Sequence, residues 1–198
     1  MLDSILCAVL AICAAVAPLP PTPITGPGIV PGQIVAPPAL DWQVVEVATP
    51  EIAESEGLPC EGDRCAAYLD RIASPPVWTI CHGETRGVRG GDVRSRAECM
   101  ISLRPRVGEY WRGVRACLTE ASLFQRMTAH RGAAYTSLAY NAGYAAVCGS
   151  TAMRRLNAGD IVGGGEALTW YNRAGGRVIL GLVNRRARER ADCERGLR

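Results

Sequence analysis

The pattern of apolar and polar positions divides the chain into three parts. Residues 5–17 form an unbroken apolar run, and residues 18–40 contain eight prolines. Such a proline-rich composition is typical of an extended linker that builds no core of its own. After residue 42, apolar residues recur at the spacings of helices and strands. The pattern therefore predicts a terminal apolar segment (1–17), a linker (18–41) and one folded domain (42–198).

The elements expected in the folded domain are short at first and helical later. A helix should start at Thr49-Pro50 and end at Glu56, because threonine caps helices, proline fits the first turn and Gly57 follows. Two strands, 64–71 and 77–82, are rich in β-branched and aromatic residues. Further helices are predicted over residues 95–118, 130–142, 150–157, 162–172 and 178–194. The fold class is therefore α+β and mostly helical, with a small β-hairpin lobe before a helical lobe.

Charge is spread unevenly along the chain. All 22 basic residues are arginines, and all of them follow residue 63. Residues 64–198 also hold 11 acids, so this part carries a net charge of 22 − 11 = +11. A basic surface concentrates polyanions, which include nucleic acids and anionic cell-wall polymers. Because no nucleic-acid-binding motif accompanies the charge, nucleic acid is not a predicted partner.

The nine cysteines favour disulfide bonds over a metal site. Their spacing is irregular apart from Cys60-x4-Cys65, and the chain has only two histidines, His82 and His130. A zinc site usually needs close ligand pairs, so no metal and no cofactor are predicted. Disulfides suit an exported domain, but the pairing stays open. An odd total leaves at least one thiol unpaired or bonded to another chain.

The apolar run allows more than one interpretation. As a helix, its 13 residues would span roughly 20 Å, short of the ~30 Å hydrocarbon core of a membrane. This length and the small residues Ala15-Val16-Ala17 fit a cleavable signal peptide, although no basic residue precedes the run. A weakly held membrane anchor that can leave the bilayer fits as well, and a segment of neither kind stays open.

Three side chains near the start of the folded domain suit the cleavage of a glycosidic bond. Such a reaction needs a protonated carboxyl group at the leaving oxygen and a second group that assists water. Glu56 would lie at a helix end, where the dipole disfavours the charged form. Asp70, which has arginines close in sequence, should stay ionised, and Thr79 on the returning strand offers a hydroxyl group to hold the water.

Motifs in both halves of the chain resemble the phage lysozyme (endolysin) family, glycoside hydrolase family 24, including its signal-anchor-release members. That family has a helix ending in Glu-Gly, a strand ending in Tyr-x-Asp and a following Thr-Ile segment. The matching segments here are Glu56-Gly57-Leu58, Tyr68-Leu69-Asp70, Thr79-Ile80-Cys81-His82-Gly83, Leu138-Ala139-Tyr140-Asn141-Ala142-Gly143, Arg155-Leu156-Asn157-Ala158-Gly159-Asp160, Trp170-Tyr171-Asn172 and Gly181-Leu182 with Arg185-Arg186 and Glu189. The resemblance covers residues 45–197 and implies a lysozyme-like fold.

The resemblance implies a muramidase that hydrolyses the β-1,4 bond between N-acetylmuramic acid and N-acetylglucosamine with inversion. Glu56 would be the general acid, and Asp70 and Thr79 would position the attacking water. Glu61 is the alternative acid, because its distance of nine residues from Asp70 matches the family without a gap. The helix-end context favours Glu56, and Cys60 and Cys65 could staple the intervening inserted loop.

Other expectations follow from the same resemblance. Tyr140 is a candidate for lining the sugar cleft, Trp170 should belong to the core, and Arg185, Arg186 and Glu189 should pair on the surface. Peptidoglycan is the implied substrate. The protein should act as a monomer in the host periplasm, exported or tethered to the inner membrane by its N-terminal segment. Two alternatives stay open, a lytic transglycosylase that cleaves the same bond and an inactive peptidoglycan-binding protein.

Overall fold

The computed structural model describes residues 38–71 and 74–197. The predicted apolar segment and nearly all of the predicted linker lie outside these residues. Among the residues that are described, no helix combines the length and the apolar character needed to cross a membrane. The predicted domain boundary at residue 42 stays a prediction.

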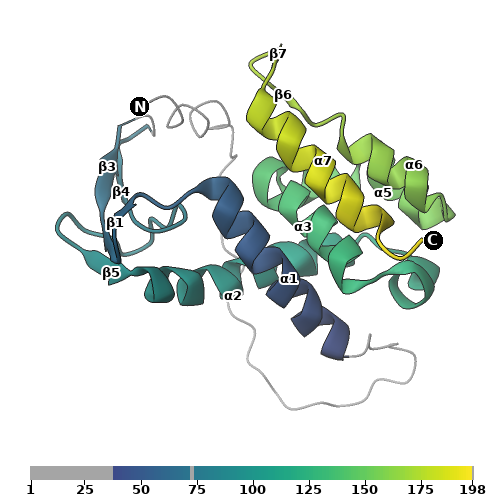
Figure 1. The fold of residues 1–198 in the computed structure, drawn as a ribbon, viewed down its shortest axis with the longest axis horizontal. Coiled ribbons are helices and arrows are strands. Elements are labelled where there is room, and N and C mark those ends of the chain that lie inside the picture. Colours follow the sequence, from purple (N-terminus) through teal and green to yellow (C-terminus); the bar gives the residue numbers. More distant parts are fainter. Residues whose placement is uncertain (1–37, 72–73, 198) are drawn as a thin grey trace.

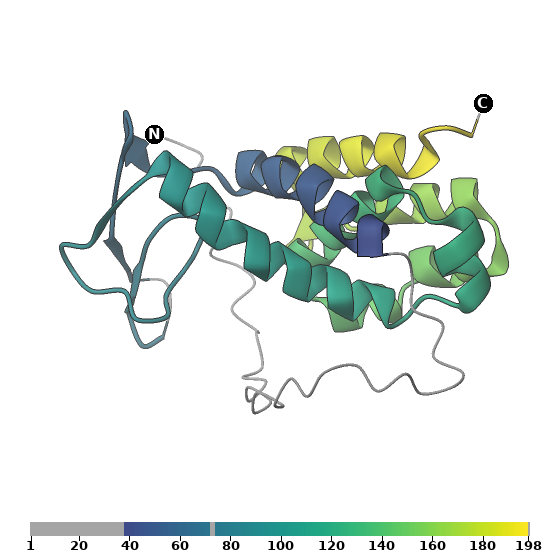
Figure 2. The same cartoon turned by 90° about the horizontal axis from the view of Figure 1, so that it is seen from below.

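The structure has two lobes (Figure 1). The short strands β1 to β5 gather in one lobe, and helices α3 to α7 form the other. Helices α1 and α2 run from the strand lobe into the helical lobe, as the second view confirms (Figure 2). The elements are α1 (Pro38–Glu56), β1 (Cys60–Glu61), β2 (Arg64–Ala66), β3 (Tyr68–Asp70), β4 (Val77–Thr79), β5 (Val93–Ser95), α2 (Arg96–Arg115), a π-helical turn (Ser122–Arg126), α3 (Ala129–Ala142), α4 (Tyr144–Cys148), α5 (Thr151–Ala158), α6 (Ile161–Leu168), β6 (Arg173–Ala174), β7 (Arg177–Val178) and α7 (Leu180–Glu194). The predicted class, α+β and mostly helical, is confirmed.

Helix α1 begins twelve residues before the predicted start at Pro50. Thr49 is not a cap, because its hydroxyl group donates to the Val45 carbonyl oxygen at 2.6 Å inside the helix. Proline within a helix costs about 3 kcal/mol or more. Here, Val44, Ala48 and Ile52 are fully buried on one face of α1. Their burial against α2 and α3 offsets that cost and keeps the helix continuous.

The strand predicted over residues 64–71 is divided between two sheets. β2 pairs with β1 and β5, whereas β3 pairs with β4. The break occurs at Ala67, whose backbone N–H donates to the Asp92 carbonyl oxygen at 2.8 Å. The second predicted strand, 77–82, ends at Thr79 because Cys81 has a φ of 55°, which turns the chain out of the extended conformation.

The predicted helices of the second lobe are confirmed to within a few residues, except that α6 ends at Leu168 rather than residue 172. Polar N-cap residues explain where these helices begin. Ser95 and Glu98 form a capping box at the start of α2, and Ser150 caps α5 through the Met153 N–H. The main core lies between α1, α2, α3, α5, α6 and α7. Its large members include Val44, Trp111, Tyr135, Leu138, Met153, Leu156 and Leu168.

Gly132 of α3 lies at a close approach between α3 and α1. A Cβ atom there would be 2.5 Å from Cγ2 of the buried Val44 and 3.3 Å from the ring of the buried Trp111. Gly132→Ala should therefore destabilise the protein by about 1–3 kcal/mol through overpacking. In the matched control Gly108→Ala on α2, the nearest atoms lie 3.8 Å away, so stability should be unchanged or higher. Thermal unfolding checks both, and an equally stable Gly132→Ala would contradict the prediction.

Within the described residues, three disulfides tie the elements together, as the cysteine content predicted. Cys60–Cys65 joins β1 to β2. This is the base of the inserted loop, where a bond between these two cysteines was predicted. The other two bonds are Cys81–Cys99 and Cys117–Cys148, which connect the loop after β4 and helix α4 to the two ends of α2. Cys193 is buried and unpaired among the described residues.

Candidate active site

Glu56 ends helix α1 and faces the helical lobe. Its side chain is 21% exposed, and its Oε1 atom accepts a hydrogen bond of 2.8 Å from Nη1 of Arg185 on α7. This ion pair is formed by the charged state of the carboxyl group. The sequence placed Glu56 at a helix end and left most of the influence on its carboxyl group to burial; the contact with the Arg185 guanidinium was not predicted.

The expectation that Arg185, Arg186 and Glu189 lie on the surface is wrong. All three are buried, because α7 turns this face toward α1 and α3. Glu189 contacts Arg186 at 2.7 Å and Arg185 at 3.5 Å. Arg185 also donates to the Ser137 carbonyl oxygen at 3.2 Å. Burial lowers the pKa of Arg186 to about 10 and raises the pKa of Glu189. The network fixes the guanidinium that holds Glu56.

Asp70 and Thr79 share one face of the β3–β4 hairpin. Tyr68 pairs with Thr79, and Asp70 pairs with Val77. Directly opposed residues in antiparallel strands point to the same side, and so do residues two apart on one strand. Asp70 and Thr79 are therefore diagonal neighbours. Thr79 is buried, and its hydroxyl group donates to the Val77 carbonyl oxygen at 3.3 Å, which leaves the oxygen lone pairs for another donor.

A groove of about 410 Å³ lies between the loop after β4 and helix α2. It is lined by His82, Gly83, Glu84, Thr85, Arg86, Cys99, Ser102, Leu103, Pro105, Arg106 and Glu109. The Cys81–Cys99 disulfide attaches the loop to α2, and Arg106 donates to the Gly83 carbonyl oxygen at 3.0 Å. The groove is thus built on a covalently fixed loop and a long helix.

Tyr140 of α3 lies beside this groove. Its hydroxyl group donates to the His82 carbonyl oxygen at 3.2 Å, and the Arg106 guanidinium is 5.3 Å from its ring centroid. Burial raises the pKa of Tyr140 to about 12, and the charge of Glu56 adds to this rise. Burial lowers the pKa of His82, and the charge of Glu56 partly opposes that change. The Tyr140 hydroxyl group thus links α3 to a residue that lines the groove.

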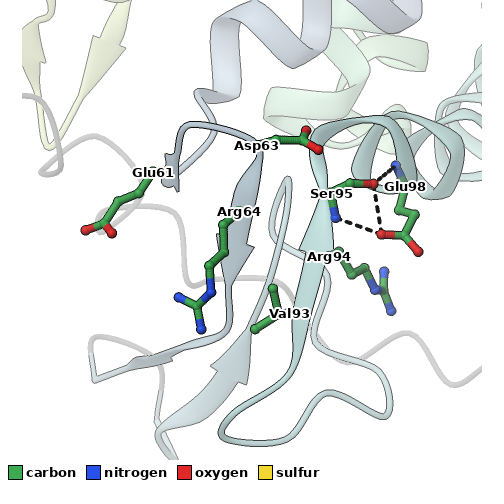
Figure 3. Close-up of a pocket in the computed structure, with 7 residues that line it drawn as sticks. All are labelled: Glu61, Asp63, Arg64, Val93, Arg94, Ser95 and Glu98. Carbon is green, nitrogen blue, oxygen red and sulfur yellow. Dashed lines mark hydrogen bonds between the residues drawn. The ribbon is translucent and has the colours of Figure 1, made fainter.

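Glu61 lies in a different environment. It is exposed on β1 and borders a second hollow, of about 450 Å³, which is lined by Glu61, Asp63, Arg64, Val93, Arg94, Ser95 and Glu98. Figure 3 shows the Glu61 side chain pointing away from Asp63, Ser95 and Glu98. The β1–β2 hairpin belongs to a different sheet from the β3–β4 hairpin that carries Asp70 and Thr79.

The sequence did not predict where Arg185, Arg106 and Trp170 lie. Arg185 is 129 positions away from Glu56, so no local pattern signals their contact. Arg106 lies on a helix rich in arginine, and nothing in its spacing marks it as the residue beside Tyr140. Trp170, expected in the core, is 52% exposed, with the Arg155 guanidinium 5.3 Å from its ring centroid.

Comparisons with known proteins agree on one family. A family model for phage lysozyme matches residues 59–189. A SAR-endolysin of Enterobacteria phage P21 is 36% identical over 134 residues, which cover 67% of this chain and 76% of that protein. A SAR-endolysin of Escherichia phage 933W is 32% identical over 152 residues, covering 73% of this chain and 84% of that protein. An endolysin structure from Escherichia coli O157:H7 phage FAHEc1 aligns with a TM-score of 0.58 and 27% identity, covering 81% of this chain and 94% of that chain.

The matched range contains Glu61, Asp70 and Thr79 but begins after Glu56, so it does not distinguish between the two candidate acids. The range matched by the family model covers most of the chain and both lobes. Neither a transglycosylase nor an inactive wall-binding protein is favoured by these relatives. The chain therefore belongs to the phage lysozyme family and is an endolysin, a muramidase that hydrolyses the β-1,4 bond between N-acetylmuramic acid and N-acetylglucosamine in peptidoglycan.

Proposed function

We propose that Glu56 is the general acid of this muramidase and that Asp70 and Thr79 position the attacking water. The observation that carries the proposal is the placement of Glu56. Its side chain is only 21% exposed at the end of α1, and its Oε1 atom is held at 2.8 Å by Nη1 of the buried Arg185. A general acid must be held at a fixed point beside the leaving oxygen, and this contact supplies that position.

Arg185 orients the carboxyl group in this proposal. It binds only Oε1 of Glu56, and Oε2 accepts no hydrogen bond from the residues that the structure describes. The free oxygen can therefore meet the glycosidic oxygen of the substrate. Glu56 must carry a proton when the bond breaks, so the ion pair with Arg185 belongs to the resting enzyme. Arg185 is thus a positioning residue, and the acid itself is Glu56.

Glu61 is the second candidate for the acid. The spacing to Asp70 supports it, and it falls inside the range matched by the family model. Its exposure counts against it, because an acid that works near neutral pH needs burial or a nearby negative charge to retain its proton. It also lies on the β1–β2 hairpin, which belongs to a different sheet from the hairpin that carries Asp70 and Thr79.

The hydroxyl and carboxyl groups on the β3–β4 hairpin support hydrolysis with a directed water. Asp70→Asn should lower kcat by about 10²–10⁴-fold, because an amide cannot accept the proton of the water. Thr79→Val should lower kcat as well, whereas Thr79→Ser keeps the hydroxyl group and should retain most activity. Release of reducing sugar ends, identified by mass, measures all three. Full activity of Asp70→Asn, or 1,6-anhydro ends from the parent protein, would overturn the water-directing roles.

We propose that residues 1–17 hold the protein at the inner membrane, on its periplasmic side, before it acts. The apolar run and the name SAR-endolysin of the relatives support this proposal. Fractionation of cells expressing the full chain should find it first with the membranes and later in the periplasm. Mass spectrometry of the periplasmic form decides between the two interpretations of the run. A chain cut after Ala17 indicates a signal peptide, whereas an intact one indicates a releasable anchor.

We further propose that the enzyme works as a monomer. Light scattering of the released full chain should give a mass near 21.1 kDa. A dimer that loses activity on dilution would contradict this.

A further inference from the structure

Three helices bring a histidine and two carboxylates together on the side of α1 that faces α7. Glu51 of α1, His130 of α3 and Asp192 of α7 each place a ligand atom within 4.8 Å of the other two. Glu51 precedes Glu56 by more than one helical turn. The cluster is separate from the groove, whose lining contains none of these three residues.

Two of the three side chains in this cluster, His130 and Glu51, lack hydrogen-bond partners among the described residues at their ligand atoms. Nδ1 of His130 is buried and makes no hydrogen bond to the described residues, although it lies 3.4 Å from Oδ1 of Asp192. The Glu51 carboxylate likewise accepts no hydrogen bond from the described residues. Burial raises the pKa of Glu51 to about 7, and the charges of Asp192 and Glu189 add to the rise. Partly buried carboxylates beside an unpaired imidazole nitrogen are unfavourable unless a cation or a proton joins them.

We propose that Glu51, His130 and Asp192 form a binding site for a divalent transition-metal ion, with Zn²⁺ as the expected occupant. One imidazole nitrogen and two carboxylate oxygens, with water in the fourth position, are an established zinc ligand set. Calcium and magnesium prefer oxygen ligands throughout, so the histidine disfavours both. Cys193 is not a ligand, because its Sγ atom is directed to the Ile161 carbonyl oxygen at 3.8 Å.

The geometry needs little adjustment to hold such an ion. Zinc bonds of about 2.0–2.2 Å in a tetrahedron separate the ligand atoms by roughly 3.4 Å. The distance between Nδ1 of His130 and Oδ1 of Asp192 is already 3.4 Å. The ligand atom of Glu51 lies within 4.8 Å of the other two, so it must approach by at most about 4.8 − 3.4 = 1.4 Å, which a side-chain rotation provides. Arg195 pairs with the same Oδ1 atom of Asp192 at 2.7 Å. Because the Arg195 side chain is 59% exposed, it can turn into solvent when a cation replaces it.

A bound ion would join α1 to both α3 and α7. These contacts lie on the helix that ends at Glu56, so the site would stabilise the docking of that helix without touching the substrate. An ion that binds the folded state and not the unfolded state raises the unfolding temperature in proportion to ln(1 + [L]/Kd). At a free concentration of about 100 Kd the expected rise is roughly 5–10 °C for a domain of this size.

The test is titration of the metal-free full-length protein with Zn²⁺ and with Co²⁺. Zinc should raise Tm by several degrees and bind in a 1:1 ratio by calorimetry. Cobalt should give visible d–d bands without the near-ultraviolet band of thiolate ligation, which excludes binding by the free cysteines. No change in Tm up to about 1 mM zinc, or a thiolate spectrum with cobalt, would overturn the proposal.

Variants assign the binding to these residues. His130→Ala and Glu51→Gln should each weaken zinc binding at least about tenfold. Glu51→Gln is expected to fold, because a neutral amide removes the repulsion from Asp192. Glu54→Gln is the matched control, since Glu54 lies on the same helix but is exposed and pairs with Arg188 at 2.9 Å. It should bind zinc as the parent does. Unchanged binding in both His130→Ala and Glu51→Gln would refute the site even if the protein binds zinc elsewhere.

Discussion

Glu56→Gln should lower kcat on peptidoglycan by about 10³-fold or more, whereas Glu61→Gln should leave kcat within about twofold of the parent. The loss of a positioned general acid typically costs about 10²–10⁴-fold. Glutamine keeps the size of the side chain and the bond to Arg185 but cannot protonate the leaving oxygen. Glu61, in contrast, extends from an exposed hairpin whose hollow contains neither Asp70 nor Thr79.

The measurement is turbidity loss of purified peptidoglycan together with the release of reducing ends. Thermal unfolding shows whether each variant folds, which matters because Glu56→Gln replaces the charged partner of a buried arginine with a neutral one. Arg185 keeps its contact with Glu189 at 3.5 Å, so the variant should fold. If Glu61→Gln is inactive and Glu56→Gln is active, the gap-free spacing identifies the acid, and Glu56 has only a structural role.

Glu56→Asp separates the chemistry of the acid from its position. Aspartate retains a titrating carboxyl group but is one methylene shorter. A displacement of about 1 Å can cost roughly 10²-fold in rate, so Glu56→Asp should be intermediate between the parent and Glu56→Gln. Equal activity of the aspartate and glutamate forms would indicate that the carboxyl group does not contact the leaving oxygen directly.

Local sequence signals predicted the helices well where polar caps and apolar spacing agreed. Ser95 and Glu98 form the capping box that their spacing suggests, and the helices from α2 onward follow. The start of α1 was missed because the proline at residue 50 outweighed the apolar spacing of Val44, Ala48 and Ile52. Their burial between α2 and α3 is a tertiary effect, and proline is tolerated there because packing compensates for the lost hydrogen bond.

In the candidate site, the sequence predicted the hairpin that connects Asp70 and Thr79, whereas their catalytic roles stay predictions. Asp70 and Thr79 meet on one face because a hairpin of fixed register connects them. The Cys60–Cys65 disulfide likewise joins residues that lie close together in the sequence. The environment of Glu56 was not predictable, because Arg185 and the residues around it come from α7 and α3. The arginine-rich pattern of α7 suggested a solvated face, but the face is buried against α1 and α3.

That burial leads to the largest expected effect on stability. Glu189→Gln should lower the free energy of unfolding by about 3–5 kcal/mol, because removing one member of a buried ion pair leaves the other charge uncompensated. Glu189 is 3% exposed and Arg186 is fully buried, and Glu189 is the acid that contacts Arg186, at 2.7 Å. For a domain of this size the loss corresponds to a fall in Tm of roughly 6–20 °C.

Glu54→Gln is the appropriate control for Glu189→Gln, because Glu54 also pairs with an arginine of α7. The Glu54 and Arg188 side chains are 72% and 53% exposed, and exposed pairs contribute about 0–1 kcal/mol. Urea unfolding should therefore show a large shift of the midpoint for Glu189→Gln and almost none for Glu54→Gln. Equal shifts of the midpoint in the two variants would mean that solvent reaches the Arg186–Glu189 pair. A midpoint shift in Glu189→Gln alone would establish that the charges holding Arg185 against Glu56 also hold α7 in the fold. The position of the proposed acid and the stability of the helical lobe would then depend on the same contacts.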